Sequence, residues 1–410
     1  MMNEKISFIH CADLHLDSPF SGLSHVSSKM FNDIRQSTFT ALHSLVSLAI
    51  ENKVDFVLIV GDLFDSEEQS LKALIRLKHA FEQLNKYDIE VYISFGNHDF
   101  LDGGNIDVDY PKNVHIFNEE TVTYFTFNKK GKAVANIYGF SYKQRGVLAN
   151  KSLEFNPTDE NVYHIGMLHG SLASNTEHDV YAPFQLSDLI NKEFDYWALG
   201  HIHKRQILKE NPPVVYPGNT QGRSKKESGE KGCYYVELDN NQNRLEFKPL
   251  QQLRFENLEI DSSCCKQPQE LEALIEEVAT KTSTELGSSI ITIHISSDSD
   301  HIEEWHQAGY IDEILDYINE SNQEVEQWVF IRSYSIEKRV NVNKQELKQG
   351  QHFLGELLRE FEGNLNIEEY LQPLLQHRQA RKFLSPFSEE EQEQIRQEAE
   401  DLLMYQLLKE

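Results

Sequence analysis

The chain has few cysteines, no long apolar run and no start typical of a secreted protein. Its 410 residues include only Cys11, Cys233, Cys264 and Cys265, without a C-x-x-C spacing. No apolar run approaches the roughly 18 residues that a membrane span needs, and the first residues lack the apolar region of a signal peptide. We therefore expect a cytoplasmic protein with reduced cysteines. A secreted disulfide scaffold, a membrane span and a fibrous protein are excluded.

Basic residues are also scarce. Lys and Arg number 39 against 66 Asp and Glu, which gives a net charge of −27. Residues 1–250 contribute −8 and residues 251–410 contribute −19. Because binding to a nucleic-acid backbone requires Lys and Arg, this balance argues against non-specific wrapping of nucleic acid. It does not exclude a groove that is basic locally. We expect the acidic residues of 251–410 to form a solvated face or a protein-docking region.

The chain is long enough for about two or three domains, and its first 250 residues show an α/β pattern. Short apolar runs rich in Val, Ile, Tyr and Phe predict buried strands. These runs are residues 6–11, 54–60, 89–95, 134–140, 162–168 and 196–199. Helical patterns at 30–52, with Phe31 and Ile34 on its apolar stripe, and at 70–86 separate the first three runs. This order predicts β-α-β units, and later turn signals predict a more antiparallel second half.

The pattern of predicted strands and helices changes from about residue 255. Strands at 255–260, 290–296 and 327–338 alternate with helices at 269–286 and 310–320, which predicts a small α+β domain over 251–340. Residues 341–410 are almost wholly helical and acidic. Two apolar stripes are expected there. They consist of Leu354, Leu357, Leu358 and Phe361, and of Ile395, Ala399, Leu402, Leu403 and Leu407.

Five polar motifs follow predicted strands. They are Asp13-Leu14-His15, Gly61-Asp62-Leu63-Phe64-Asp65, Gly96-Asn97-His98-Asp99, His169-Gly170 and Gly200-His201-Ile202-His203. Ligand sites of α/β sheets lie at the carboxyl ends of strands, so these loops are expected to converge. Carboxylates, one amide oxygen and imidazoles suit divalent Mn, Fe or Zn. Because seven such side chains are too many for one ion, we expect two ions about 3.5–4 Å apart that share a carboxylate.

The order of these motifs resembles that of the calcineurin-like metallophosphoesterases, whose pattern is D-x-H, G-D-x-x-D/H, G-N-H-D/E, H and G-H-x-H. Within that family the chain is similar to the SbcD-type nucleases of DNA repair. The stretches 10–20 and 216–223 are more similar still to the YhaO-type subgroup. The resemblance covers about residues 5–250. It implies a β-sandwich flanked by helices, a small capping domain and a helical C-terminal region.

The resemblance also implies a ligand set. One ion would be held by Asp13, His15, Asp62 and His203, and the other by Asp62, Asn97, His169 and His201, with Asp62 bridging. Mn²⁺ is the favoured ion, with Fe or Zn as alternatives.

His98 is left outside the metal shell and is expected to stabilise charge on the phosphate or to protonate the leaving oxygen. Asp99 either orients the ring of His98 or bonds its own turn. Asp65 and Asp17 are candidates for supporting the ligands or for capping. Cys11 is interpreted as a buried thiol at the end of a strand.

Basic residues near the motifs are candidates for binding DNA: Lys204, Arg205 and Arg223. The lysines at 129, 130 and 132 are interpreted equally well as ordinary turn residues.

We therefore expect a two-metal DNA phosphodiesterase, an SbcD-like exo- or endonuclease. The resemblance implies a coiled-coil ATPase partner of the SbcC or YhaN kind, and a homodimer is left open. The alternatives are a phosphoesterase acting on small molecules (a cyclic nucleotide, a dinucleotide or a phosphomonoester) and a non-catalytic, metal-organised scaffold.

Overall fold

The structure is a computed structural model. It describes residues 4–20, 26–65, 69–103, 108–158, 161–174, 181–239, 243–339 and 353–362, and the single positions 392, 395, 396, 399 and 407. The chain divides into two compact units. The first comprises Met1–Leu258, Ile275–Ile293 and Glu313–Tyr334, and the second comprises Glu259–Leu274, His294–Asp312 and Ser335–Glu410. The domain boundaries expected at residues 250 and 340 stay a prediction.

The first sheet has the strand order β12-β11-β1-β2-β3-β4. Its strands are β1 (Ile6–Cys11), β2 (Phe56–Val60), β3 (Glu90–Ser94), β4 (Val114–Ile116), β11 (Gly232–Leu238) and β12 (Arg244–Pro249). Strands β1 to β4 run parallel, whereas β11 runs antiparallel to both β1 and β12. The sheet therefore ends its parallel strands β1, β2 and β3 at one edge, where three of the five motifs follow.

The second sheet has the order β5-β6-β7-β8-β10-β9. Its strands are β5 (Thr123–Lys129), β6 (Lys132–Gly139), β7 (Tyr163–His169), β8 (Tyr196–Gly200), β9 (Gln206–Glu210) and β10 (Pro213–Tyr216). The four central strands are parallel, and the edge strands β5 and β9 are antiparallel to their neighbours. The remaining two motifs follow β7 and β8.

The two sheets pack face to face. Side chains alternate along each strand, so Phe8 and Phe56 point to the second sheet while Ile9 and Val57 point the other way. The inner layer joins residues of both sheets, and the rings of Phe8 and Phe56 stack with their centroids 4.9 Å apart. The six predicted strands are confirmed as β1, β2, β3, β6, β7 and β8, within a sandwich of two mixed sheets.

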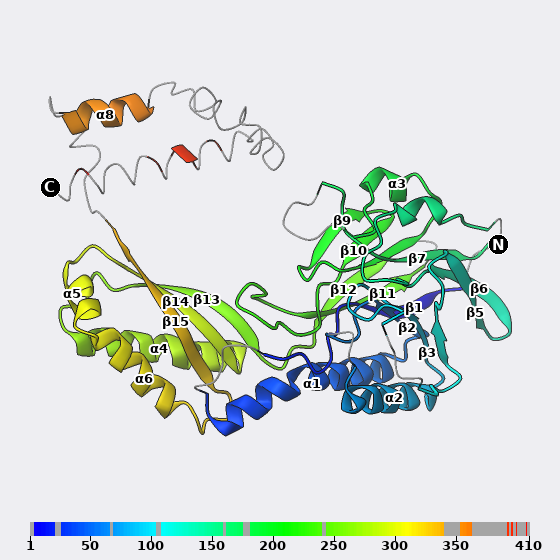
Figure 1. The fold of residues 1–410 in the computed structure, drawn as a ribbon, viewed down its shortest axis with the longest axis horizontal. Coiled ribbons are helices and arrows are strands. Elements are labelled where there is room, and N and C mark those ends of the chain that lie inside the picture. The colour runs from blue at the N-terminus through cyan, green and yellow to red at the C-terminus, as the bar shows by residue number, and fades with distance from the viewer. Residues whose placement is uncertain are drawn as a thin grey trace. The chain divides into compact units, whose positions relative to one another are not determined.

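Helices cover the outer faces of the sandwich. Helices α1 (Ser28–Asn52) and α2 (Leu71–Asn85) lie side by side on the first sheet, and α3 (Leu186–Ile190) and the 3₁₀-helix η1 (Lys151–Glu154) accompany the second (Figure 1). Ser27 and Ser70 start α1 and α2, because each hydroxyl accepts a hydrogen bond from a first-turn N–H. Phe31, expected on the apolar stripe, is 43% exposed. The buried stripe of α1 begins with Met30 and Ile34 instead.

A third sheet follows in the order β13-β14-β15. It consists of β13 (Arg254–Asp261), β14 (Ser289–Ser297) and β15 (Val329–Lys338), linked through α4 (Pro268–Leu286) and through α5 (His301–Gln307) and α6 (Tyr310–Ser321). Backbone hydrogen bonds join 254 to 288 and 262 to 296, so the strands are parallel. This corrects the expected α+β class of the unit. Helical connections between neighbouring strands require a parallel, α/β arrangement.

Helix α1 reaches the start of β15 within the first compact unit. Met30 and Ile34 pack against Phe255 and Trp328, which is fully buried. The indole N–H of Trp328 donates a hydrogen bond to the carboxylate of Asp33 at 3.0 Å. A buried aromatic ring with its polar atom paired fixes the orientation of this contact.

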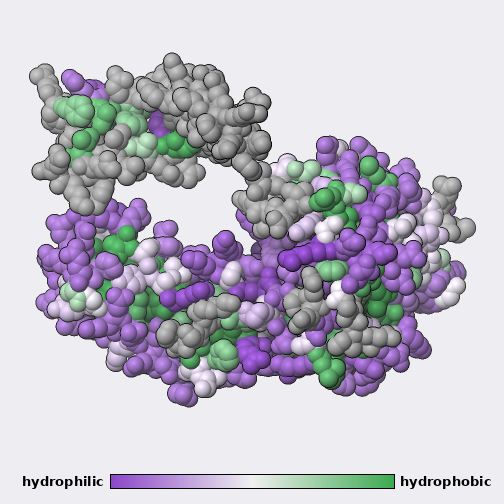
Figure 2. All heavy atoms as spheres, in the orientation of Figure 1, coloured by the Kyte–Doolittle hydropathy of each residue, from purple (hydrophilic) through white to green (hydrophobic). Residues whose placement is uncertain are grey.

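Most of the predicted helical tail lies outside the described residues, including Leu402 and Leu403. Helix α8 (Phe353–Glu362) is described, and in it Leu358 and Phe361 are buried. No helix among the described residues is both long and apolar enough to cross a membrane. The described surface on the face drawn in Figure 2 is mostly hydrophilic, with separate apolar patches.

Candidate metal centre

The loops that follow β1 and β2 run alongside each other beyond the sheet. The backbone N–H of Asp13 donates to the carbonyl of Gly61 at 3.1 Å, and that of His15 donates to the carbonyl of Asp62 at 3.0 Å. Asp13, His15 and Asp62 have φ values of 53°, 42° and 52°, and His201 has a φ of 91°. L-residues seldom adopt this left-handed region. Such conformations cost free energy and cluster at functional sites, so the loops are built to aim these side chains.

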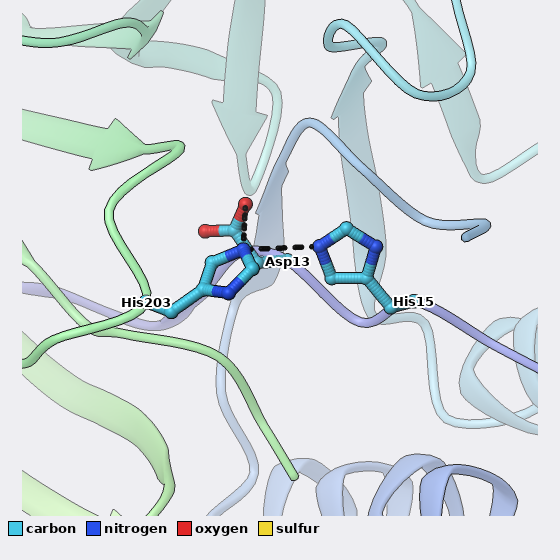
Figure 3. Close-up of side chains that lie close together, drawn as sticks. All are labelled: Asp13, His15 and His203. Carbon is cyan, nitrogen blue, oxygen red and sulfur yellow. Dashed lines mark hydrogen bonds and ion pairs between the residues drawn. The ribbon is translucent and has the colours of Figure 1, made fainter. Parts of the chain in front are cut away.

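Asp13, His15 and His203 form a first cluster (Figure 3). The Nε2 atoms of the two imidazoles lie 3.1 Å apart, and Nε2 of His203 lies 3.7 Å from Oδ1 of Asp13. Asp13 and His15 are buried, whereas His203 is partly exposed. The three ligand atoms lie within the reach of one ion.

A second cluster forms around His169. Its Nε2 atom lies 3.1 Å from Oδ1 of Asn97 and 3.6 Å from Oδ2 of Asp62. Nδ1 of His201 lies 3.1 Å from the same oxygen of Asn97. Asp13, Asp62 and His169 likewise offer ligand atoms within the reach of one ion. The structure therefore brings together all seven side chains that the sequence predicts as ligands.

Asp62 lies between the clusters. Its Oδ2 atom is 3.8 Å from Nε2 of His15 in the first cluster and 3.6 Å from Nε2 of His169 in the second. Asp13 takes part in both groups of candidate ligands. Asp62 lies within 4 Å of an imidazole in each cluster, which is the position that a bridging ligand requires.

Hydrogen bonds set the orientation of two imidazoles. Nδ1–H of His169 donates to the carbonyl of Val60 at 3.0 Å, so its Nε2 lone pair points into the site. Nδ1 of His203 lies 2.7 Å from Oε1 of Glu227, again on the side away from the cluster. Such partners of the outer nitrogen are typical of metal-binding histidines.

The charges of the site call for a cation. Burial, and then the neighbouring Asp62, raises the pKa of the Asp13 carboxyl well above its usual range. Burial would also raise the pKa of Asp62, but the imidazoles of His169 and His98 lower it overall. Burial lowers the pKa of His15 well below its usual range, so this ring is neutral. Buried carboxylates beside neutral imidazoles fit divalent cations, which would supply the missing positive charge.

His98 adjoins the site without joining either cluster. Its Nδ1–H donates to the backbone carbonyl of Asp65 at 2.8 Å, and its backbone N–H donates to Oδ1 of Asp62 at 3.0 Å. The rings of His98 and His15 meet edge to face with centroids 5.0 Å apart. Its Nε2 atom is therefore the one left to meet a substrate.

Asp99 does not orient His98. One of its carboxylate oxygens accepts from the N–H of Gly96 at 2.7 Å, and the other accepts from the N–H of Leu63 at 2.6 Å. Burial raises the pKa of Asp99 to about 8. Of the two interpretations of Asp99, these contacts match the carboxylate that bonds its own turn rather than the one that orients His98. The carboxyl group also ties that turn to the loop after β2, and the carbonyl of Asp65 takes the place at Nδ1 of His98.

Glycines make room for the ligands. A Cβ atom on Gly96 would lie 2.3 Å from Oδ1 of Asp62, and one on Gly61 would lie 2.2 Å from Nδ1 of His169. One on Gly200 would lie 2.0 Å from the carbonyl oxygen of Val60. The glycine before each ligand in three of the motifs is thus required by the close approach of the loops.

The basic residues expected to contact DNA differ in their surroundings. Lys204 is exposed. Arg205 places its guanidinium 3.9 Å from the centroid of the Phe247 ring and 3.8 Å from the carboxylate of Glu230. Arg223 is largely buried and pairs with the carboxylates of Asp65 and Glu227 beside the first cluster. The lysines at 129 and 130 pair with acidic residues at 55 and 4, which supports the interpretation as turn residues.

Two residues beside the site escaped sequence reasoning. Glu227 bonds His203, and Lys231 is buried and donates its ammonium to the backbone carbonyl of His203 at 2.9 Å. Burial lowers the pKa of Lys231. The sequence offers one signal for these residues, which is their position shortly after the stretch 216–223. Nothing in the local sequence shows that this loop returns to the site.

His10, in strand β1 just before the first motif, is a histidine of the core. Its Nε2–H donates to the carbonyl of Leu199 at 3.0 Å, and its Nδ1 accepts from the hydroxyl of Tyr196 at 2.9 Å. Burial lowers the pKa of His10 to about 3. Cys11 beside it is also buried, with its thiol 3.4 Å from the carbonyl of Leu58, as expected.

The pKa of His10 predicts an acid-sensitive fold. Between its unfolded pKa of about 6.5 and its folded pKa of about 3, only the unfolded chain binds the proton, so stability falls with decreasing pH by about 1.4 kcal/mol per unit. Urea unfolding in the presence of a chelator checks this. Between these two pKa values, the free energy of unfolding of His10→Gln should fall less steeply with decreasing pH than that of wild type, by about 1.4 kcal/mol per pH unit. The same pH dependence in both proteins would contradict the lowered pKa of His10.

The chain is similar to a known protein family and to several known proteins. Residues 6–205 match the calcineurin-like phosphoesterase family. The chain is 37% identical over 406 residues to "Uncharacterized metallophosphoesterase YhaO" of Bacillus subtilis, covering 98% of both chains. It is 26% identical over 242 residues to "DNA double-strand break repair protein Mre11" of Thermoplasma acidophilum, and 28% identical over 246 residues to the protein of that name from Methanocaldococcus jannaschii. These two matches cover 55% and 57% of this chain and 63% of each relative.

Proposed function

The chain belongs to the calcineurin-like metallophosphoesterases, and from this premise we propose that it hydrolyses phosphodiester bonds of DNA. The observation that supports the proposal is the convergence of seven ligand side chains in two clusters around Asp62, with His98 beside them. The relatives named as double-strand break repair proteins favour DNA as the substrate.

The seven ligand side chains form two cation sites in this proposal. Asp13, His15 and His203 would hold one divalent cation, and Asn97, His169 and His201 the other, with Asp62 shared. When bound, a pair of cations activates a water molecule as the nucleophile and neutralises charge on the phosphate. Mn²⁺ is the first candidate, and the N- and O-donor set also suits Fe or Zn.

His98 would act on the leaving side of the reaction. With Nδ1–H held by the carbonyl of Asp65, a protonated ring presents Nε2–H to the phosphate or to the departing oxygen. That proton stabilises the charge that develops as the ester bond breaks, and its transfer completes the alcohol. Asp99 contributes by holding the two loops that carry Asp62 and His98 together.

A second candidate function is hydrolysis of small phosphate esters. The net charge of −27 favours it, as do the ion pairs that engage Arg205 and Arg223, because these two side chains are then less available to a DNA backbone. A metal-organised scaffold without catalysis is the third candidate. The complete ligand set and the position of His98 beside it weigh against that role.

Direct comparison of substrates tests the proposal. With Mn²⁺ present, the protein is expected to degrade linear duplex DNA and to hydrolyse bis-p-nitrophenyl phosphate, and to act far more slowly on p-nitrophenyl phosphate. His98→Ala serves as the inactive control. Preference for the phosphomonoester, or for a cyclic dinucleotide over duplex DNA, would replace the nuclease by the small-molecule enzyme.

We propose further that residues 341–410 dock a coiled-coil ATPase of the SbcC or YhaN kind. The anchors expected for such a helix-in-groove contact are Leu354, Leu358, Phe361, Leu402, Leu403 and Leu407. In α8, Leu358 and Phe361 are already buried, which favours packing within this chain for that stripe.

Truncation after Val340 tests whether the tail docks the ATPase or serves the fold of its own chain. We expect the truncated protein to retain hydrolysis of bis-p-nitrophenyl phosphate and to lose co-purification with a co-expressed ATPase of that kind. Unfolding, or undiminished binding, would make the tail a structural element of its own chain.

A further inference from the structure

The two imidazoles of the first cluster each meet a carboxylate on their outer side. Nδ1 of His203 is hydrogen-bonded to Oε1 of Glu227 at 2.7 Å. Nδ1 of His15 lies 3.3 Å from Oδ1 of Asp65, but without the geometry of a hydrogen bond. Asp65 follows β2, whereas Glu227 lies in the loop between β10 and β11. The two carboxylates therefore come from distant parts of the chain, and each lies beside one of the two rings.

One guanidinium joins these carboxylates. Arg223 pairs through one terminal nitrogen with Asp65, and its other terminal nitrogen lies 3.5 Å from Oε1 of Glu227. Glu227 is held in addition by the backbone N–H of Arg223 at 2.7 Å and by the side-chain amide of Asn219 at 2.9 Å. The side chains of Asp65, Arg223 and Glu227 are 19%, 18% and 14% exposed, so solvent competes little for this network.

We propose that Arg223 is a positioning residue for one of the two cation sites rather than a contact to DNA. By fixing Glu227, it keeps the proton of His203 on Nδ1 and turns the Nε2 lone pair of that ring toward Asp13 and His15. By fixing Asp65, it holds a second carboxylate beside the ring of His15. The inference rests on the proposed function in one respect, namely that this cluster holds a cation. The prediction that Arg223 binds the substrate is the alternative that the same experiments test.

The chemistry of arginine suits this role. Its planar guanidinium offers donors in two directions at once, which a lysine ammonium on a flexible stem cannot reproduce. Without it, two carboxylates beside the cluster would repel each other and could rotate away from the imidazoles. The second cluster is independent of this device, because the carbonyl of Val60 orients His169.

Cation binding by the whole protein tests the proposal. Titration of the metal-free protein with Mn²⁺ in a calorimeter should show two sites in wild type. In Arg223→Lys and Arg223→Met, one site should weaken by about 10–100-fold and the other should keep its affinity. Glu227→Gln should weaken the same site. Arg244→Lys, at a 61% exposed arginine paired with Glu246, is the matched control and should bind as wild type.

A second readout reports the rings directly. In metal-free protein labelled with ¹⁵N-histidine, the signal of His203 should show the Nδ1–H form in wild type and a mixture of forms in Arg223→Met. His169 should not change. If Arg223→Met fails to fold, the same spectrum of Glu227→Gln decides, since that variant keeps the shape of the side chain.

The outcomes separate the alternatives. Normal binding of both cations together with a raised KM for duplex DNA would make Arg223 a substrate contact and overturn the proposal. Equal weakening of both sites would also overturn it. A wild-type protein that binds two cations in this way but does not cleave DNA would contradict the proposed substrate and leave the positioning role of Arg223 intact.

Discussion

Asp62→Asn is expected to release both cations and to lower phosphodiester hydrolysis by at least about a thousandfold, because both ions of the pair depend on one carboxylate. Oδ2 of Asp62 lies 3.6 Å from the nearest imidazole nitrogen of one cluster and 3.8 Å from that of the other. An amide keeps the shape of the side chain and an acceptor for the backbone N–H of His98, but it removes the charge. Elemental analysis of the purified protein measures the loss.

His15→Ala is the control for this prediction. His15 belongs to the first cluster alone, so its removal should empty chiefly one site while the other stays occupied. Full occupancy of both sites in Asp62→Asn would contradict a bridging role. Loss of both ions in both variants would show that the two sites bind cooperatively, and the affinity of each titrated separately would then rank the two residues.

His98→Ala should separate metal binding from turnover. The ring touches neither cluster as a ligand, and its Nδ1–H is already held by the carbonyl of Asp65. Metal content should therefore survive, while hydrolysis falls by about 10²–10⁴-fold, the usual effect of losing a general acid or a charge-stabilising donor. Metal analysis and kcat for bis-p-nitrophenyl phosphate are measured on the same preparation.

The leaving group offers a sharper check on His98. An ester with a more acidic alcohol needs less protonation, so the rate deficit of His98→Ala should shrink for such substrates if the ring is a general acid. A constant deficit would indicate charge stabilisation of the phosphate. Loss of metal in parallel with activity would make His98 a ligand, and a normal rate would remove it from the mechanism.

The sequence predicts the central strands well because each is buried on both faces. Residues 56–60 are all buried, which produces the uninterrupted apolar run that identifies β2. Edge strands such as β9 and β12 alternate weakly and carry many exposed side chains, so they leave little trace in the sequence. The short strand β4 is held by pairing with β3 rather than by its own three residues.

The ligands could be located because each follows a predicted strand directly. The residues that orient them could not, since Glu227 meets His203 only after the loop between β10 and β11 returns to the site. Arg223 and Asp99 show a different limit of the sequence. Their charge and their place beside the motifs suggest contacts with substrate or with His98, but the sequence does not show that Arg223 pairs with the carboxylate of Asp65, or that Asp99 accepts from the N–H of Gly96.

The central claim is that the two clusters hold two cations that share Asp62. Anomalous diffraction from crystals soaked in Mn²⁺ tests it most directly. The account predicts two peaks about 3.5–4 Å apart, one beside Asp13, His15 and His203 and one beside Asn97, His169 and His201, with Asp62 between them. A single peak, or peaks away from these side chains, would contradict it.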